Sequence, residues 1–175
     1  LSRDRPLVMG ILNVTPDSFS DGGQFSTIES ALTHARKMAA EGADIIDIGG
    51  ESTRPGAMPV SACEEIERVL PIIQAIRRES DIAVSVDTSK AAVIHAAQSE
   101  GIDLINDVCA LRQEGAMDAA SQSGTLVCLV HMLGEPRTMQ QNPDYQDVVS
   151  DVYDFLADRV SACEAAGIPR TKIVL

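Results

Sequence analysis

The sequence is poor in basic residues and has no long apolar run. It has 14 Lys and Arg against 26 Asp and Glu, so the formal net charge is −12 at pH 7. A surface this negative repels phosphate backbones and anionic lipids, so a nucleic-acid or membrane partner is not expected. No apolar run approaches the roughly 20 residues of a membrane-spanning helix. Residues 1–6 also lack the apolar core of a secretory signal.

Paired cysteines and low-complexity segments are missing too. The four cysteines are far apart in the chain and include no C-x-x-C motif (Cys63, Cys109, Cys128 and Cys163). This spacing indicates reduced, mostly buried thiols, so we expect a cytoplasmic protein. The 175 residues are 45% hydrophobic and contain no evident linker, which is enough for one core. We therefore expect a single domain over residues 1–175.

The sequence contains a repeated alternation of short apolar runs with amphipathic stretches. The apolar runs are residues 7–14, 43–48, 82–86, 102–105 and 125–130, and residues 172–175 begin another. Apolar residues at helical spacing lie between them. Nearly continuous apolar runs that alternate with helices predict a parallel sheet covered by helices.

Helix signals accompany this alternation. Ser26 and Ser61 each open a capping-box pattern. Pro71 lies inside the second helical pattern and predicts a kink or a break there. A long apolar stripe over residues 148–163 predicts the last helix.

The predicted strands end on residues of a similar polar kind. These residues are Asn13, Asp47, Asp87, Asn106 and His131. The most polar of the loops that follow is residues 47–56, DIGGESTRPG, which read alone is also compatible with a solvated loop closed by an Arg–Glu pair. Because parallel strands with helical crossovers place their carboxyl ends on one edge, these side chains are expected at one site.

The preferred fold class is an α/β TIM barrel, (β/α)8, because five strand ends converge on one point only if the sheet closes. The chain supplies about strands 1–5 and the start of strand 6 of such a barrel, so we expect a domain that is incomplete at its C-terminus. A flavodoxin-like five-stranded sheet is the alternative, although the first turn lacks a G-x-G-x-x-G or P-loop pattern.

Three of the loops carry a resemblance to a known family. They are residues 10–23 (GILNVTPDSFSDGG), residues 47–56 and residues 85–89 (SVDTS), and Asn106-Asp107 and the loop from His131 to Met139 are also similar. With these segments the chain resembles dihydropteroate synthase, a folate-biosynthesis enzyme with a TIM-barrel fold, over about the first two thirds of the family's length. The resemblance implies joining of 4-aminobenzoate to 6-hydroxymethyl-7,8-dihydropterin pyrophosphate, in an enzyme that is a sulfonamide target.

The resemblance also implies roles for the strand-end residues. Asp87 and Asn106 match pterin-binding positions, and their acceptor and mixed donor–acceptor chemistry suits the edge of a pterin. Asn13 matches a contact to Mg²⁺, the implied cofactor, and to pyrophosphate. From the residues alone, Asp87 could instead cap the following helix, and Asn13 could stabilise its own turn.

Further site residues lie in the loops. By resemblance Thr53 and Arg54 bind substrate, and Asp17, Phe19 and Asp21 belong to a second loop that closes over the pterin. Asp87, Arg54 and Asp21 are the predicted catalytic residues, and Met132 is a predicted substrate contact. Asp47 and Glu51 are expected to brace the loop base, and His131 to pack rather than bind a ligand.

Two other functions remain open from the sequence. One is a methyltetrahydrofolate-binding methyltransferase module, which shares a pterin pocket but needs no pyrophosphate site. The other is an inactive fragment that only binds pterin or a partner chain. The resemblance implies small-molecule substrates as partners and a homodimer for the full-length form.

Overall fold

The computed structural model describes residues 5–14, 24–52, 58–134, 139 and 143–175, with the backbone alone for residues 24–27. Strands and helices alternate along these residues, as predicted. In order they are β1 (Met9–Asn13), α1 (Gln24–Ala40), β2 (Ile45–Gly49), α2 (Ala62–Glu79), β3 (Ala83–Asp87), α3 (Ala91–Ser99), β4 (Leu104–Asp107), α4 (Ala116–Ser123), β5 (Leu126–Leu129), α5 (Val148–Ala165), the 3₁₀ helix η2 (Arg170–Lys172) and β6 (Ile173–Val174).

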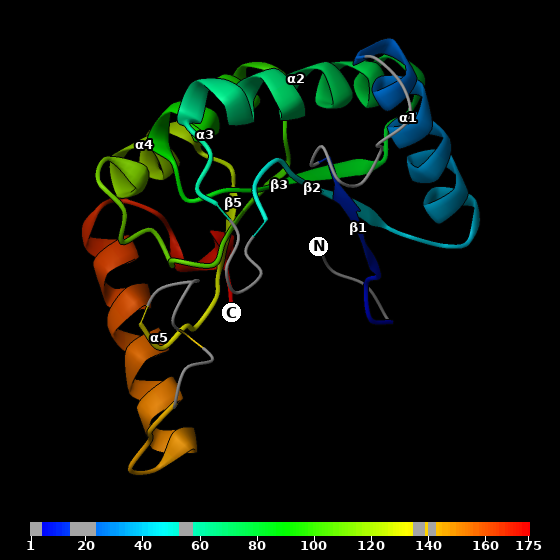
Figure 1. Ribbon diagram of the computed structural model, residues 1–175. Coiled ribbons are helices and arrows are strands. Elements are labelled where there is room, and N and C mark those ends of the chain that lie inside the picture. Colours follow the sequence, from blue (N-terminus) through cyan, green and yellow to red (C-terminus); the bar gives the residue numbers. More distant parts are fainter. Residues whose placement is uncertain (1–4, 15–23, 53–57, 135–138, 140–142) are drawn as a thin grey trace.

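The strands form one parallel sheet in the order β1-β2-β3-β4-β5-β6. Figure 1 shows α1 to α4 side by side along one face of this sheet, with α5 extending from its far end. In a flavodoxin-like sheet the first strand lies inside, between the second and third. The sequential order observed here excludes that alternative and is the order of barrel strands.

The face of the sheet that meets the helices is apolar. One row of paired residues on this face consists of Leu12, Ile48, Val86, Ile105 and Val127. Each of these side chains is at most 1% exposed. Burying a side chain of this size stabilises the fold by about 1.5–3 kcal/mol relative to exposure. The row therefore anchors the helices to the sheet and fixes which residues point to the opposite face.

The starts of the helices only partly follow the sequence signals. The Ser61 side chain accepts a hydrogen bond from the Glu64 backbone N–H and caps α2, as predicted. α1 begins at Gln24, so the predicted cap at Ser26 is wrong, because that residue lies inside the first turn. Of the predicted kink or break at Pro71, the break is wrong, since α2 continues through this residue, and the kink stays a prediction. A proline removes only one helical hydrogen bond, and buried side chains on either side of it hold the helix in place.

The last helix is capped by Asp147, whose side chain accepts hydrogen bonds from the backbone N–H groups of Val149 and Ser150. Only the far end of its predicted stripe is buried, at Val160 and Cys163. Val149 is 75% exposed. None of the helices described here is long and apolar enough to cross a membrane.

Candidate functional site

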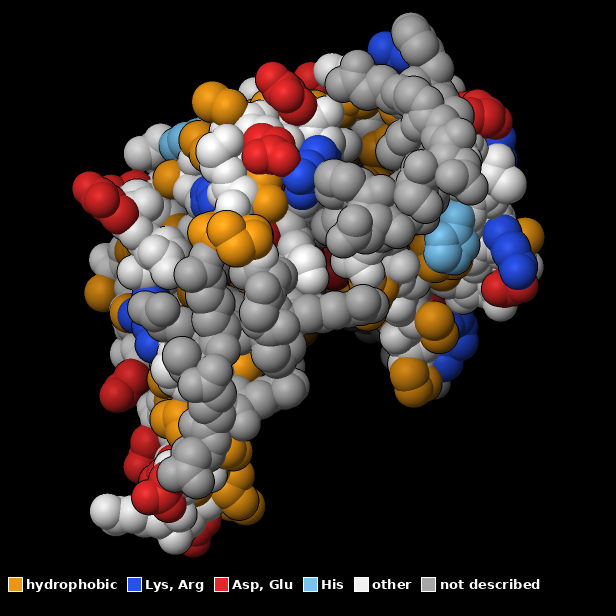
Figure 2. Space-filling model, viewed as in Figure 1, with side chains coloured by type: hydrophobic (Ala, Val, Ile, Leu, Met, Phe, Trp, Pro, Cys, Tyr) orange, Lys and Arg blue, Asp and Glu red, His pale blue; other side chains and the backbone are white. Residues whose placement is uncertain are grey.

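Polar side chains lie in one row across the carboxyl ends of the strands. Asn13 pairs with Gly49, Gly49 with Asp87, Asp87 with Asn106, and Asn106 with Cys128. Residues paired in a parallel sheet point to the same side, so this row faces away from the helices. The helix-free side of the molecule is hollowed between α5 and the β1 end of the sheet (Figure 2). The predicted convergence of Asn13, Asp87 and Asn106 is therefore observed.

Gly49 leaves a gap at the centre of this row. A Cβ atom there would lie 3.4 Å from Asn13 Oδ1 and 3.7 Å from Asp87 Oδ2. These two oxygens therefore lie within about 7 Å of each other, on either side of a residue that has no side chain. Two hard oxygen atoms of the kind that ligate metal ions thus lie on either side of Gly49.

Asn106 is oriented from below by a buried carboxylate. Its Nδ2 donates a hydrogen bond to Asp47 Oδ2 over 3.0 Å. Asp47 is 3% exposed and lies one layer deeper, paired with Ser85. Burial raises the pKa of Asp47, against the opposing effects of the Ser85 hydroxyl and the Asn106 amide. Asp47 thus supports a neighbouring side chain, although the prediction had it brace the loop base.

The inner face also holds polar atoms that lack a well-formed hydrogen bond. Among the residues described, Asp47 Oδ1 and Ser85 Oγ on this face, and Glu65 Oε1 on the helix side, are buried without a hydrogen bond of normal geometry. Buried polar groups are normally paired, because each unpaired group costs about 1–3 kcal/mol. Two of these three atoms lie beneath the row that carries Asp87 and Asn106, as expected where a site is preorganised for a polar ligand.

Asp87 is the most electrostatically perturbed member of the row. Its pKa is raised to about 7, first by burial and then by repulsion from Asp47, Asp107, Glu65 and Glu51. No donor in the described part of the chain hydrogen-bonds to its carboxylate, and α3 begins instead from Lys90. The alternative that Asp87 caps α3 is therefore not observed. A carboxylate held this way favours a ligand that brings N–H donors.

The row continues onto β5 at Cys128, which was not among the predicted site residues. Burial raises the pKa of this thiol, and the charges of Asp47 and Asp87 raise it further. It therefore stays protonated at neutral pH. The signal in the sequence was the strand alternation, which places Cys128 opposite Asn106 once the register is known.

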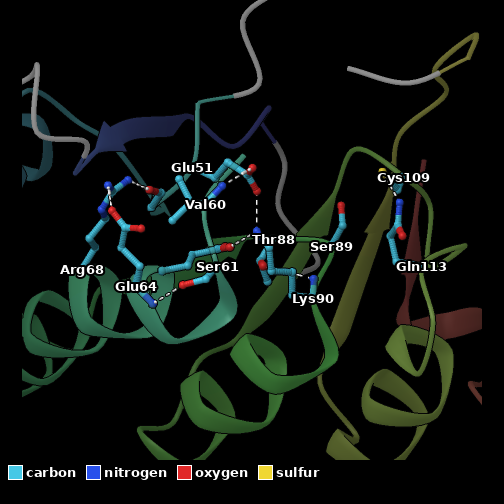
Figure 3. Close-up of polar contacts among 12 residues, drawn as sticks. Glu51, Val60, Ser61, Glu64, Arg68, Thr88, Ser89, Lys90, Cys109 and Gln113 are labelled. Carbon is cyan, nitrogen blue, oxygen red and sulfur yellow. Dashed lines mark hydrogen bonds and ion pairs between the residues drawn. The ribbon is translucent and has the colours of Figure 1, made fainter. Parts of the chain in front are cut away.

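Glu51 stabilises the base of the loop that follows β2. Its Oε1 accepts a hydrogen bond from Val60 N over 3.1 Å, and its Oε2 is paired with the Lys90 ammonium. Glu51 thus joins the two sides of this loop, as Figure 3 shows. The expectation that it braces the loop base agrees with this geometry.

The other partner of Lys90 was missed from the sequence. Lys90 also pairs with Glu65 of α2, whose side chain is 1% exposed. Glu65 lies four residues before Val69 and seven before Ile72, on the buried side of α2. An acidic residue on an otherwise apolar stripe was therefore the available signal. Gly50 packs directly over it, since a Cβ there would lie 2.9 Å from Glu65 Cγ.

Several predicted site residues lie outside the described residues. These are Asp17, Phe19, Asp21, Thr53 and Arg54, and their roles stay predictions.

The residues after β5 are described. Met132 is 5% exposed. The His131 ring packs edge-on against Phe155 at 4.9 Å between centroids, as expected for a packing histidine. The substrate contact of Met132 stays a prediction.

Metal ligands are sparse at the site. No group of three or more His, Cys, Asp or Glu in the described ranges could hold a metal ion. Asn13 is exposed at the rim of the sheet, with its amide oxygen facing the gap at Gly49. A metal here would take most of its ligands from substrate and water. Its binding to Asn13 stays a prediction.

The order of strands and the polar row define the class: a parallel α/β barrel-type protein with a row of polar side chains at the carboxyl ends of its strands. A family model described as pterin binding enzyme matches residues 9–175. The chain belongs to this family. The fold class and the family resemblance predicted from the loops are thus confirmed.

Individual relatives agree with this assignment. The chain is 52% identical to the dihydropteroate synthase of Haemophilus influenzae over 169 residues, covering 97% of this chain and 62% of that protein. It is 49% identical to the Escherichia coli enzyme over 175 residues, covering 100% of this chain and 62% of that enzyme. It therefore spans about three fifths of the length of these relatives.

Solved structures of similar proteins also match this chain. The Yersinia pestis dihydropteroate synthase with a sulfonamide drug complex matches with a TM-score of 0.92 and 51% identity, covering 99% of this chain and 63% of that one. The Burkholderia cenocepacia enzyme in complex with 7,8-dihydropteroate matches with a TM-score of 0.86 and 50% identity, covering 99% of this chain and 58% of that one.

Proposed function

We propose that this chain forms the pterin-binding part of a dihydropteroate synthase. The reaction condenses 4-aminobenzoate with (7,8-dihydropterin-6-yl)methyl diphosphate to give 7,8-dihydropteroate and diphosphate. The observation that carries this proposal is the row formed by Asp87 and Asn106 over buried Asp47, in a chain about half identical to synthases of that name. One such relative was solved with 7,8-dihydropteroate and another, from Xanthomonas albilineans, with 4-aminobenzoic acid.

The chemistry of the row suits the edge of a pterin. That edge presents an amino group and a ring N–H beside acceptors. Ionised Asp87 accepts from two N–H groups, and Asn106, whose Nδ2 is held by Asp47, keeps its amide oxygen as an acceptor. Pairing with N–H donors would lower the pKa of Asp87 from about 7, so pterin binding favours its ionised form. Met132 is the proposed apolar contact.

The diphosphate leaving group has to be stabilised in a strongly acidic protein. Asn13 Oδ1 fits the oxygen donor set of Mg²⁺, which usually takes one or two protein ligands beside phosphate and water. When bound, Mg²⁺ would supply charge stabilisation to the departing diphosphate. Departure of diphosphate before attack by the aromatic amine is the proposed order. A secondary isotope effect near unity at the pterin methylene would contradict it.

The remaining roles follow the family. Arg54 and Thr53 are proposed to bind the anionic groups of the substrates, and Phe19 and Asp21 to help form the 4-aminobenzoate pocket. Arg54, Asp21 and Asp87 are the proposed catalytic residues. We further propose a cytoplasmic enzyme and sulfonamide target that works as a homodimer, with residues 1–175 as one part of a single barrel domain.

The test is dihydropteroate formation by the full-length protein, with and without Mg²⁺, and by its Asp87→Asn variant. We expect activity in the wild type and a loss of about 100-fold or more in the variant, because one neutral amide cannot replace a carboxylate that accepts two N–H groups. Asp118→Asn, which changes an exposed carboxylate of α4, serves as the control and should retain activity.

Assays of methyl transfer and of pterin binding beside this one separate the competing functions. Methyl transfer from methyltetrahydrofolate to a corrinoid, without dihydropteroate formation, would support the methyltransferase module. Pterin binding with neither reaction would support a binding role alone.

A further inference from the structure

The turn that follows β4 has an unfavourable backbone. Ala110 and Leu111 have φ angles of 52° and 57°. Side chains with a Cβ rarely adopt this left-handed region, and two such residues in succession are rarer still. Strain of this kind persists only where the surroundings hold the backbone in place, and it is often found next to functional sites.

Asp107 holds this turn from inside. It is the last residue of β4 and its side chain is fully buried. Oδ1 accepts a hydrogen bond from Cys109 N over 2.7 Å, and Oδ2 accepts one from Leu111 N over 2.8 Å. Both carboxylate oxygens therefore bind N–H groups of the strained turn.

Arg159 of α5 holds the same turn from outside. Its Nε donates to the Ala110 carbonyl over 2.8 Å, and its Nη2 donates to the Leu111 carbonyl over 3.3 Å. The two left-handed residues are thus fixed through their carbonyl groups by one side chain, while Asp107 binds the Leu111 N–H.

The bonds of Asp107 also reach the neighbouring strand end. The Ser89 hydroxyl, two residues after Asp87, donates to Asp107 Oδ1. The Thr88 N–H donates to the Asn106 carbonyl over 3.0 Å. Successive side chains on a strand alternate sides, so Asp107 points towards the helices while Asn106 points to the inner face. Asp107 therefore does not touch a ligand on that face.

We propose that Asp107 is a positioning residue for pterin recognition: by holding the strained turn after β4, it keeps Asn106 beside Asp87. This inference rests on the proposed pterin-binding role of those two residues. Without the carboxylate, the turn relaxes from its left-handed backbone and Asn106 moves out of the row.

The first test is steady-state kinetics of the full-length Asp107→Asn variant. The Asn side chain has a single acceptor oxygen, so it cannot bind both backbone N–H groups as the carboxylate does. We expect the KM for the pterin substrate to rise about tenfold or more, because small misplacements of a binding group are costly. The KM for 4-aminobenzoate should stay unchanged. General destabilisation would lower kcat and leave both KM values alone, and that result would overturn the proposal.

A rescue experiment tests the role of strain. Glycine adopts positive φ angles without penalty. Ala110→Gly added to Asp107→Asn should therefore reverse at least about a third of the rise in the KM for the pterin substrate. The matched control is Ala119→Gly, which changes a buried alanine within the α4 helix and should restore nothing. Equal effects of the two glycine substitutions would contradict the proposal.

Hydrogen exchange separates this inference from the proposed function, because it needs no substrate. The amides of Cys109 and Leu111 should exchange at least about tenfold faster in Asp107→Asn, and Ala110→Gly should reverse part of this change. Unchanged exchange would show that Asp107 does not hold the turn. If the wild type makes no dihydropteroate, the proposed function fails, while the exchange rates still decide what Asp107 does to the turn.

Discussion

The buried carboxylates on the two sides of the strand ends differ in how many hydrogen-bond and ion-pair partners they have. On the helix side, Glu65 Oε2 pairs with the Lys90 ammonium, while Glu65 Oε1 has no described partner, and Asp107 has two backbone N–H groups and a hydroxyl. On the inner side, Asp47 has one described donor, the amide of Asn106, and Asp87 has none in the described part of the chain. The two sides are separated by only one residue along each strand.

This difference separates carboxylates that stabilise the fold from carboxylates that are available to a ligand. A buried carboxylate with a full set of partners stabilises the fold around it, whereas one without partners costs stability and needs a reason to be there. The reason proposed for the inner side is a ligand that brings its own donors. Substitutions on the inner side should therefore lower binding and activity directly. Substitutions on the helix side should lower stability and affect binding only where they shift a residue of the inner row, as proposed for Asp107.

The largest effect on stability is expected for Lys90→Met. It leaves Glu65, which is 0% exposed, buried without its counter-ion. Removing one partner of a buried pair costs about 3–5 kcal/mol in the free energy of unfolding, measurable by urea denaturation. Adding Glu65→Gln should recover part of that loss. Arg36→Met, which breaks an exposed pair with Glu79, is the control and should change little. Equal losses in the two single variants would remove the contrast.

Neighbouring residues of β3 should sharpen the comparison at a smaller scale. Val86→Ala deletes buried apolar atoms on the helix side and should cost about 2 kcal/mol. Ser85→Ala removes a buried hydroxyl without a well-formed hydrogen bond on the inner side, so it should leave the free energy of unfolding unchanged or raise it by about 1 kcal/mol. Thermal and urea unfolding measure both. A loss of unfolding free energy at Ser85 as large as at Val86 would contradict the claim that polar groups of the inner face lack hydrogen-bond partners.

A pH dependence of the free energy of unfolding is expected from Asp87. Its pKa lies near 7 in the folded protein, above its ordinary value of 3.8. The folded state therefore binds the proton more tightly than the unfolded state between about pH 4 and pH 7, and the wild type loses stability as pH rises through this window. Asp87→Asn removes this contribution, so the wild-type stability minus the variant stability should fall over the same range. A difference that is flat with pH would show that the burial and repulsion at Asp87 are weak.

The sequence predicted the sheet and the row well for a physical reason. Short apolar runs between helical patterns leave few arrangements, and parallel strands with crossovers must place Asn13, Asp87 and Asn106 at one edge. The helix starts were less certain, as α1 shows, because a capping pattern does not prevent a helix from beginning earlier.

What the sequence could not give depends on contacts between distant segments. Lys90 meets Glu65 across 25 residues. The raised pKa of Asp87 comes from burial and from carboxylates on other elements. The left-handed backbone at Ala110 and Leu111 has no local signal, since neither residue is a glycine. Each of these features appears only when the strands and helices have packed.

The most direct test of the central claim is calorimetric binding of 6-hydroxymethyl-7,8-dihydropterin to the full-length protein. Asp87→Asn and Asn106→Ala should each weaken the affinity by about 10- to 100-fold, because each removes hydrogen bonds to the ligand, and those to Asp87 are to a charged group. Asp87→Asn should unfold at a temperature no lower than that of the wild type, whereas Asn106→Ala leaves buried Asp47 without its amide donor, so its binding is measured well below its own unfolding temperature. Wild-type affinity in both variants would show that the pterin is bound elsewhere and would contradict the account.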